Sequence, residues 1–358
     1  MKRRLLFVNT IQFGYHTDAY MHCNYLKDKY DISFLCFDTG RKKIYMDGIK
    51  IIYVPYNGSR NMRGIRFLIY SVLKMIFFKG LICVIYFPGV RYIKKVLPWK
   101  KMILDIRSLG VSSISSDNIK FDSELKNTAL LYDHITIISE GIRDKLDLPF
   151  NKTTILPLGA NPVSEKKKQF NSLNLFYVGT LSDRNIEKTI YGLDKFIKQN
   201  NDVDITYDIV GDGYNNEIEK LQKLSKNLGI CNIVKIHGSI PNTELKPFFD
   251  KCNIGVSFIP IRDHYEYQPA TKTFEYVMSG LYTIATATYE NKKVINENNG
   301  ILIKDSTEDF RKALEYIIKN RKRISTLDIS ETLVNYKWGK IVNNILYPLL
   351  IKLEKKWF

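Results

Sequence analysis

Lys272 and Glu275 stand three residues apart in the otherwise apolar segment PATKTFEYVMSG, residues 269–280. The proline at its start and the glycine at its end predict a short helix, on which residues three apart share a face. A carboxylate there can accept two hydrogen bonds from a vicinal diol such as a ribose, and the lysine can neutralise a phosphate. The alternative is a simple ion pair within the helix, which stabilises a helix by roughly 0.2–0.5 kcal/mol.

Arg184 is a second candidate for anion binding. It lies in LFYVGTLSDRNIEKTI, where we expect a strand to end at Gly179 and a helix to start near Ser182 or Asp183. Free backbone N–H groups at a helix start attract anions, and a guanidinium in the first turn can bind a diphosphate. The alternative is an ordinary solvated charge in the first turn of a helix.

Glycines also follow the next two strand-like runs. YDIVGDGYNNEIEKL contains Gly211 and Gly213, and IVKIHG contains His237 and Gly238. Two glycines alone are weak evidence for a nucleotide site, because glycine there can simply permit a tight turn. His237, taken alone, is more typical of a structural residue than of a catalytic one.

The amino-terminal half contains its own candidates. The loop TIQFGYHTDAYMH carries a glycine after the expected first strand and three titratable side chains: Gly14, His16, Asp18 and His22. LDIRSLG places Asp105 at the end of another strand, where a carboxylate could take the proton of an acceptor hydroxyl. The alternative for Asp105 is a structural pair with Arg107. If Asp105 is a base, the expected stereochemical outcome is inversion rather than retention.

The segments that must position these residues alternate between short, β-rich apolar runs and helix-like stretches, which is typical of parallel βαβ units. A polar, lysine-rich stretch, 161–172, interrupts the alternation and predicts a linker. The length of 358 residues exceeds what one compact core usually holds. We therefore predict an α/β protein with two doubly wound, Rossmann-like domains that face a cleft. Ligands of such sheets bind beyond the carboxyl ends of the strands, where the motifs above fall.

The formal net charge of the chain is +17. No acidic residue occurs from Gly48 to Leu104, whereas lysine and arginine occur eleven times there. Such a surface favours anionic partners, namely nucleic acid, an acidic membrane or phosphorylated substrates. No RNP-type, helix-turn-helix or zinc signature accompanies the charge, so we expect no nucleic-acid partner and keep a basic nucleic-acid-binding protein as an alternative.

Within residues 60–101 the cations alternate with Phe, Tyr and Trp side chains. We expect an amphipathic helix over about 65–78 and a buried strand over 82–87. Such a helix suits peripheral contact with an anionic membrane. The alternatives are a buried helix with a solvated basic rim and a transmembrane helix within 67–87.

The cysteines and the amino terminus bear on location. The five cysteines show no CxxC or Cys/His spacing, which disfavours zinc sites and disulfide frameworks and fits a cytoplasmic setting. The apolar run in MKRRLLFVNTIQFG is short, so it predicts a first buried strand rather than a signal peptide.

Four motifs, taken in order, resemble the carboxyl-terminal domain of GT-B fold glycosyltransferases of the family 4 type, the glycosyl transferases group 1. They are YVGTLSDRNI, IVGDGYNNEIEKL, KIHGSIPNTELKPFFDKCNIGVSFIP and PATKTFEYVMSG, within about 170–305. The amino-terminal half matches the family only in its rhythm of strands and helices.

The resemblance implies roles for the candidate residues. Glu275 would hold the ribose of a nucleotide-sugar, and Arg184 and Lys272 would neutralise the diphosphate leaving group. The family is typically metal-independent, so no metal or other cofactor is expected, and side-chain cations would stabilise the developing charge. The remaining donor-binding positions would act through the backbone: Gly14, Gly179, Gly211, His237 and Gly238.

The resemblance also implies a division of labour along the chain. We expect an acceptor-binding domain over 1–163, a nucleotide-sugar domain over 164–335, and a terminal helix, 336–358, that packs back toward the first domain. The chain departs from the family pattern at Tyr267, which stands where a glutamate is common, and at Thr180, which stands where an arginine is common.

The expected function is therefore that of a hexosyltransferase-like glycosyltransferase, which moves a sugar from a nucleotide-sugar to a glycan or lipid-linked acceptor. By family habit it would serve surface polysaccharide biosynthesis from the cytoplasmic face of the cell membrane. A nucleotide-sugar epimerase on the same fold is a further alternative. The donor sugar, nucleobase, acceptor and stereochemistry stay open.

Overall fold

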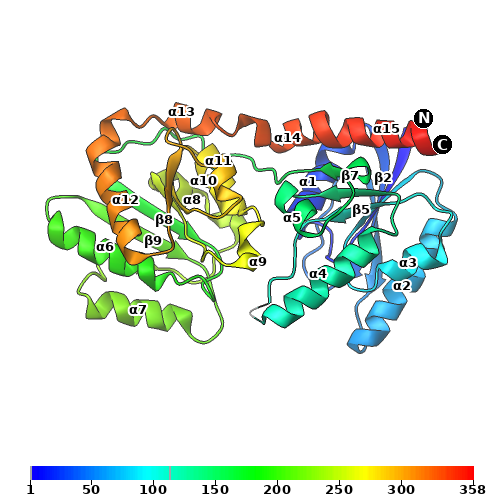
Figure 1. The fold of residues 1–358 in the computed structure, drawn as a ribbon, viewed down its shortest axis with the longest axis horizontal. Helices are drawn as coiled ribbons and strands as arrows, with labels where there is room; N and C mark the ends of the chain where they lie inside the picture. Colours follow the sequence, from blue (N-terminus) through cyan, green and yellow to red (C-terminus); the bar gives the residue numbers. More distant parts are fainter. Residues whose placement is uncertain (1, 113) are drawn as a thin grey trace. The chain divides into compact units, whose positions relative to one another are not determined.

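The computed structural model describes residues 2–112 and 114–358 and divides the chain into two α/β units (Figure 1). The first unit comprises the residues up to Gly159 together with Trp338–Phe358, and the second comprises Ala160–Lys337. Each unit is built around one parallel sheet, so the predicted pair of doubly wound α/β domains is confirmed.

Within the described residues, the sheet of the first unit has seven strands in the order β3-β2-β1-β4-β5-β6-β7. The strands are β1 (Arg3–Val8), β2 (Tyr30–Asp38), β3 (Ile49–Pro55), β4 (Leu81–Ile85), β5 (Ile103–Ile106), β6 (His134–Ile137) and β7 (Thr153–Ile155). The helices are α1 (Thr17–Leu26), α2 (Arg60–Ile76), α3 (Arg91–Val96), α4 (Ser115–Ala129), α5 (Glu140–Lys145), α14 (Trp338–Ile341) and α15 (Tyr347–Trp357). The order turns back at the β1–β4 pair, which is the switch point of a doubly wound sheet.

The described part of the second unit has six strands in the order β10-β9-β8-β11-β12-β13. The strands are β8 (Leu173–Val178), β9 (Ile205–Val210), β10 (Val234–Ile236), β11 (Ile254–Ser257), β12 (Tyr282–Thr286) and β13 (Gly300–Ile303). The helices are α6 (Glu187–Gln199), α7 (Glu217–Asn227), α8 (Lys246–Lys251), α9 (Asp263–Glu266), α10 (Thr271–Met278), α11 (Asn291–Val294), α12 (Thr307–Asn320) and α13 (Thr326–Glu331).

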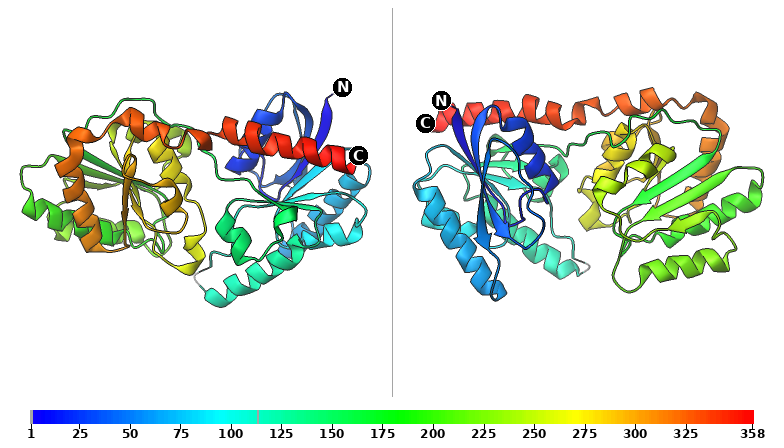
Figure 2. Two further views of the ribbon diagram at one scale, coloured as in Figure 1. Left: turned by 45° about the horizontal axis from the view of Figure 1, so that its top comes forward. Right: turned by 180° about the vertical axis from the view of Figure 1, so that it is seen from behind.

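Parallel strands are covered by helices on both faces, which explains their near-continuous apolar sequences. Every residue of β4 and of β12 is buried. In the second unit α6 and α12 pack together on one face of the sheet, while α8 and α10 lie on the other (Figure 1, Figure 2).

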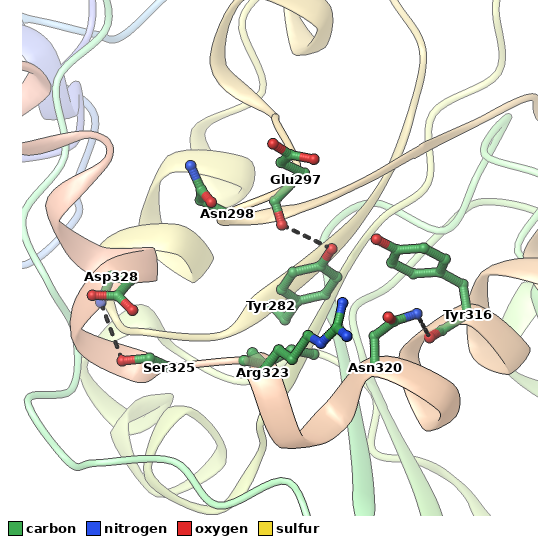
Figure 3. Close-up of a pocket in the computed structure, with 9 residues that line it drawn as sticks. Tyr282, Glu297, Asn298, Tyr316, Asn320, Arg323, Ser325 and Asp328 are labelled. Carbon is green, nitrogen blue, oxygen red and sulfur yellow. Dashed lines mark hydrogen bonds between the residues drawn. The ribbon is translucent and has the colours of Figure 1, made fainter.

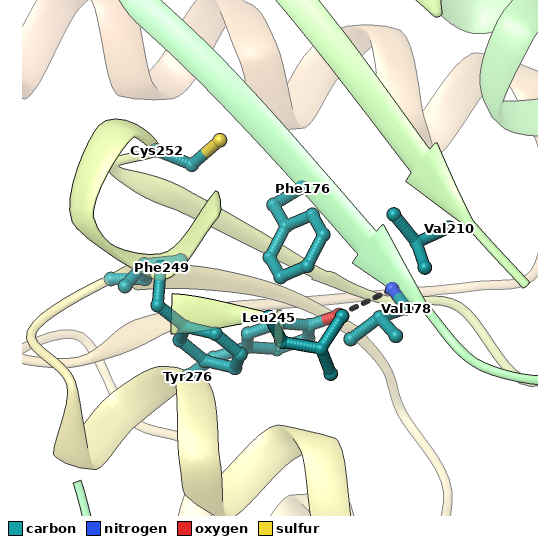
Figure 4. Close-up of a cluster of buried hydrophobic side chains, with 8 residues drawn as sticks. Phe176, Val178, Val210, Leu245, Phe249, Cys252 and Tyr276 are labelled. Carbon is teal, nitrogen blue, oxygen red and sulfur yellow. Dashed lines mark hydrogen bonds between the residues drawn. The ribbon is translucent and has the colours of Figure 1, made fainter. Parts of the chain in front are cut away.

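A cluster of buried side chains joins α8 and α10 to the sheet of the second unit (Figure 4). The ring of Phe176 on β8 lies 5.3 Å from that of Phe249 and 5.9 Å from that of Tyr276, between centroids. The Tyr276 hydroxyl accepts a hydrogen bond from the backbone N–H of Val178 at 2.8 Å. Gly255 of β11 makes room for this tyrosine, since a Cβ there would lie 2.5 Å from its ring. The packing holds α10 against the end of β8.

The hydrophobic segment 67–87 is not a single helix. Helix α2 ends at Ile76 and β4 begins at Leu81, so the prediction of a helix followed by a strand is confirmed with shifted bounds. Across residues 2–112 and 114–358, no helix combines the length and the hydropathy needed to cross a membrane.

Candidate active site

The loops after β8, β9 and β10 meet at the carboxyl edge of the second sheet. The backbone N–H of Gly179 donates to the carbonyl of Val210 at 3.1 Å, and the N–H of Gly211 donates to the carbonyl of Gly238 at 2.8 Å. Three glycines singled out from the sequence are therefore neighbours in one hydrogen-bonded set of loops.

Gly211 is the position in these loops that most requires glycine. Its φ of +154° lies in a region that side-chain-bearing residues rarely adopt, and a Cβ there would lie 1.9 Å from the carbonyl oxygen of Gly179. Gly238 also has a positive φ, of +71°. The loops after β8 and β9 can approach each other this closely only because position 211 has no side chain.

A pocket of about 310 Å³ opens beside these loops, at the ends of β8 and β11 and the start of α10. Three of the predicted residues line it, namely Gly179, Arg184 and Lys272. Two threonines, Thr180 and Thr271, add hydroxyl groups to its wall. The pocket therefore combines two cations with backbone and hydroxyl groups that can form hydrogen bonds.

Lys272 and Glu275 lie in the first turn and a half of α10, as the sequence predicts. The lysine Nζ lies 2.6 Å from the Glu275 carboxylate and 3.3 Å from the side-chain oxygen of Asn242. The lysine and glutamate side chains remain 24% and 19% exposed. The intrahelical ion pair is thus present, and both of its members can still reach a ligand.

The expected helix start near Ser182 or Asp183 is wrong, because α6 begins at Glu187. Asp183 and Asn185 have φ values of 57° and 54°, in the left-handed region that aspartate and asparagine tolerate better than most residues. Such residues interrupt a right-handed helix, so the chain forms a turn that carries Arg184 instead.

The guanidinium of Arg184 lies over the ring of Tyr265, 4.2 Å from its centroid. This contact holds the cation at the pocket wall by a cation–π interaction. Tyr265 is not among the residues that the sequence singles out. A tyrosine between β11 and α10 gives no signal in sequence that distinguishes it from its neighbours Tyr267 and His264.

His237 Nε2 lies 2.7 Å from a carboxylate oxygen of the buried Asp208, which also pairs with Lys251 at 2.7 Å. The imidazole packs edge-on against Phe248, with 5.0 Å between centroids. The ring is therefore oriented by structural contacts, while the adjoining backbone belongs to the glycine loops that line the edge of the sheet.

The first unit holds Gly14 and Asp105, the remaining candidates. Gly14 has a φ of +90°, and a Cβ there would lie 2.5 Å from the side chain of Ile44. Asp105 at the end of β5 is 2% exposed and accepts a hydrogen bond from the Thr136 hydroxyl at 2.8 Å. Its carboxylate also lies 3.7 Å from the guanidinium of Arg107.

Arg107 connects Asp105 to Asp18, with which it forms a buried ion pair and hydrogen bond. Burial raises the pKa of Asp105, and Arg107 offsets only part of that rise. Burial would also raise the pKa of Asp18, but Arg107, His22 and His16 outweigh it, so the pKa of this carboxyl is lowered. These surroundings favour the structural alternative for Asp105, because a catalytic base must be accessible to the acceptor and this carboxylate is buried.

A second pocket, of about 210 Å³, lies near the amino end of β12 (Figure 3). Tyr282, Tyr316, Glu297 and Arg323 are among the residues that line it. None of the residues predicted from the sequence belongs to this pocket. It lies at the edge of the sheet opposite to the glycine loops, since Tyr282 begins its strand.

Residues 172–320 match the family model described as glycosyl transferases group 1. Comparison with curated proteins gives no match. The matched region contains every candidate residue of the second unit, including Arg184, Lys272 and Glu275.

The fold is shared with solved structures of low sequence identity. Sucrose-phosphate synthase from Thermosynechococcus elongatus is 16% identical, with a TM-score of 0.77 over 98% of this chain and 100% of that one. Anabaena HepE, solved in complex with UDP and glucose, is 12% identical, with a TM-score of 0.74 over 97% and 99%. The lipopolysaccharide outer core galactosyltransferase WaaB is 14% identical, with a TM-score of 0.71 over 98% and 100%. These structures establish the architecture of both units.

Proposed function

We propose that this chain is a group 1 glycosyltransferase that transfers a hexose from a nucleotide-sugar to a glycan or lipid-linked acceptor, because residues 172–320 match that family's model and the chain has the GT-B fold. The observation that carries the proposal is the partly exposed Lys272–Glu275 pair, whose lysine lines the same pocket as Gly179 and Arg184. The UDP and UDP-glucose complexes of Anabaena HepE support this class of donor.

In the proposed complex, Glu275 accepts hydrogen bonds from the ribose hydroxyls, and Lys272 exchanges its carboxylate partner for a phosphate oxygen. The acceptor oxygen forms a bond to the anomeric carbon while the bond from that carbon to the diphosphate breaks, and the acceptor proton passes to a base or to water. Negative charge grows on the departing diphosphate, where Arg184 and Lys272 stabilise it. We propose that these cations suffice without a metal ion.

We further propose that the enzyme acts in surface polysaccharide biosynthesis, as a peripheral protein on the inner face of the cell membrane. Residues 60–101 supply the contact. Spacings of three and four place one row of apolar side chains along α2, and all of them are exposed: Met62, Ile65, Ile69, Leu73 and Ile76. The opposite face of the helix is buried through Phe67, Ser71 and Met75. An exposed apolar row in a segment that lacks acidic residues suits an anionic lipid surface.

Co-sedimentation with vesicles tests the membrane contact. We expect binding to phosphatidylglycerol-containing vesicles, weaker binding to phosphatidylcholine vesicles, and loss of binding in an Ile65→Ser/Leu73→Ser protein. Leu327→Ser, in the second unit, is the control because Leu327 is a comparably exposed leucine, at 59% against 55% for Leu73. Equal weak binding to both vesicle types would remove the proposal.

The donor assignment is tested by melting temperature in the presence of UDP, GDP or a short oligonucleotide. A ligand that binds only the folded state raises the melting temperature. Stabilisation by a nucleoside diphosphate and not by the oligonucleotide supports the enzyme, whereas the reverse supports a nucleic-acid-binding protein. Release of the diphosphate from a panel of nucleotide-sugars separates a transferase from an epimerase, which returns the nucleotide-sugar intact with an altered sugar.

A further inference from the structure

A pocket of about 220 Å³ lies in the first unit, at the carboxyl ends of β2, β3 and β4 and the first turns of α2. Four aromatic side chains line it: Phe37, Tyr56, Phe67 and Phe87. The ring of Phe67 lies 4.5 Å from that of Phe37 and 5.3 Å from that of Phe87, between centroids. These three phenylalanines are at most 7% exposed, so they form a packed apolar floor.

Two guanidinium groups stand at the same pocket, on Arg60 and Arg63. The Arg63 guanidinium lies over the Tyr56 ring, 4.1 Å from its centroid. Within the described residues neither arginine pairs with a carboxylate, and no acidic side chain lines the pocket. By contrast, Arg66, one turn along α2, donates to the carbonyls of Pro55 and Asn57. Arg60 and Arg63 are thus positive charges without a protein anion to compensate them.

An uncompensated pair of guanidiniums above an aromatic floor has a specific chemical complement. Guanidinium groups bind phosphate through paired, charge-assisted hydrogen bonds. The aromatic floor adds affinity only for a ligand that also has apolar carbon to bury. A soluble sugar phosphate would leave the floor unused, whereas a lipid phosphate would occupy both parts of the pocket.

The exposed row on α2 indicates where such a lipid comes from. The row and the pocket lie on opposite faces of α2, because Phe67 of the buried face lines the pocket whereas Met62 and Ile65 of the exposed row do not. A helix that lies on an anionic bilayer through this row would keep the pocket within about one helix diameter, roughly 10–12 Å, of the lipid headgroups. The charge of the segment, which lacks acidic residues from Gly48 to Leu104, is complementary to that surface.

We propose that this pocket binds the phosphate-bearing head and the adjoining apolar carbons of a membrane lipid, and that this lipid carries the acceptor. The inference rests on the proposed glycosyltransferase function, since it names the acceptor class of that enzyme. The arginine pair selects the phosphate, and the phenylalanine floor selects the hydrocarbon next to it.

Calorimetric titration with farnesyl phosphate, held below its micelle concentration, tests the proposal. We expect farnesyl phosphate to bind at least tenfold more tightly than farnesol or inorganic phosphate, because each control lacks half of the recognised group. Equal affinity for farnesol would show a merely apolar pocket, and equal affinity for inorganic phosphate a free-phosphate site; either result overturns the proposal.

Variants localise the binding. Arg60→Gln/Arg63→Gln is expected to weaken farnesyl phosphate binding at least tenfold. Lys220→Gln/Lys223→Gln is the matched control: it removes the same charge, at the same spacing, from the exposed face of α7 in the second unit. If the arginine variant and the lysine variant lost farnesyl phosphate affinity equally, the effect would be one of non-specific charge, and the assignment of the pocket would be overturned.

UDP and GDP separate the failure of this inference from failure of the function that it presupposes. If the parent protein and both variants are stabilised by a nucleoside diphosphate but none binds farnesyl phosphate, only the acceptor assignment is wrong. If neither nucleoside diphosphate stabilises the parent protein, the proposed transferase function itself fails. The same melting curves show whether each variant is folded.

Discussion

Each unit carries a cluster of opposite charges, and the two clusters differ in exposure. In the second unit, Lys272 and Glu275 are 24% and 19% exposed at their side chains. In the first unit, Arg107 pairs with Asp18 beside Asp105, and these side chains are 7%, 10% and 3% exposed. Both clusters were candidates for chemistry on sequence grounds, because each places a cation close to a carboxylate near the end of a strand or the start of a helix.

The difference shows how exposure divides structural from functional charge. A buried ion pair has lost its hydration, so each partner depends on the other, and removing one leaves an uncompensated charge. A partly exposed pair contributes little to stability and can exchange its partner for a ligand at low cost. Lys272 and Glu275 are therefore suited to binding, and Arg107 to holding β5 and α1 together.

The largest expected effect is on the buried cluster. We expect Arg107→Met to lower the free energy of unfolding by about 3–5 kcal/mol, because it strands the carboxylate of Asp18 in the interior. Urea denaturation measures the change. Lys126→Met is the control, since it removes an exposed ion pair with Asp147 and should cost at most about 1 kcal/mol. A loss of similar size in both proteins would contradict the structural role of Arg107.

The exposed pair should show the opposite profile, with binding lost and stability kept. We expect Glu275→Gln to weaken UDP or GDP binding by about 10- to 100-fold, as for a lost charge-assisted hydrogen bond. Calorimetry on the folded protein measures this. Glu297→Gln, in the pocket at the opposite edge of the sheet, should leave the affinity unchanged. Unaltered affinity in Glu275→Gln would refute the ribose role.

The buried cluster should also respond to pH through His22. Burial, and then Arg107, lower the pKa of His22 to about 3, from an ordinary value of 6.5. The folded state disfavours the imidazolium form of His22. The contribution of this group to the free energy of unfolding is therefore complete above pH 6.5 and is lost as the pH falls toward 3. We expect stability to fall by about 2 kcal/mol from pH 7 to pH 5 through this group.

Denaturation curves of the parent protein and His22→Gln, compared at both pH values, isolate this contribution from other groups in the cluster. His16 also has a lowered pKa, and Asp105 a raised one, but both remain in the variant. Identical pH dependence in the two proteins would mean that His22 is not held neutral by the fold.

The smallest expected effect is the stability change of Lys272→Met. We expect the free energy of unfolding to move by no more than about 0.5 kcal/mol, since an intrahelical pair of this kind stabilises a helix by only that amount. The same urea experiment used for Arg107→Met measures it. If Lys272→Met lost nearly as much free energy of unfolding as Arg107→Met, the distinction between the two clusters would be wrong.

The backbone framework was predictable because its signals are local. Buried parallel strands leave continuous apolar runs, and the start and end of α10 were marked by Pro269 and Gly280. The start of α6 was not marked in the sequence, because Asp183 and Asn185 suit both a helix start and a left-handed turn. Sequence alone could not decide between those two conformations.

Side-chain surroundings were less predictable, because they depend on residues far apart in the chain. Asp105 is enclosed by Thr136 from the neighbouring strand and by Arg107, whose partner Asp18 comes from α1. Tyr265 reaches Arg184 across about eighty positions of sequence. Neither contact follows from periodicity or motif spacing, so the exposure of each candidate had to come from the structure.

The close approach of Gly211 to Gly179 has a consequence for how the proposed donor site can evolve. Position 211 has no space for even a methyl group, because a Cβ there would lie 1.9 Å from the carbonyl oxygen of Gly179, so substitution at this position is excluded. A change in the proposed donor must instead come from side chains that border the cavity, such as Thr180 and Thr271. Libraries for retargeting the enzyme would gain most from randomising those two positions while leaving the glycine turns intact.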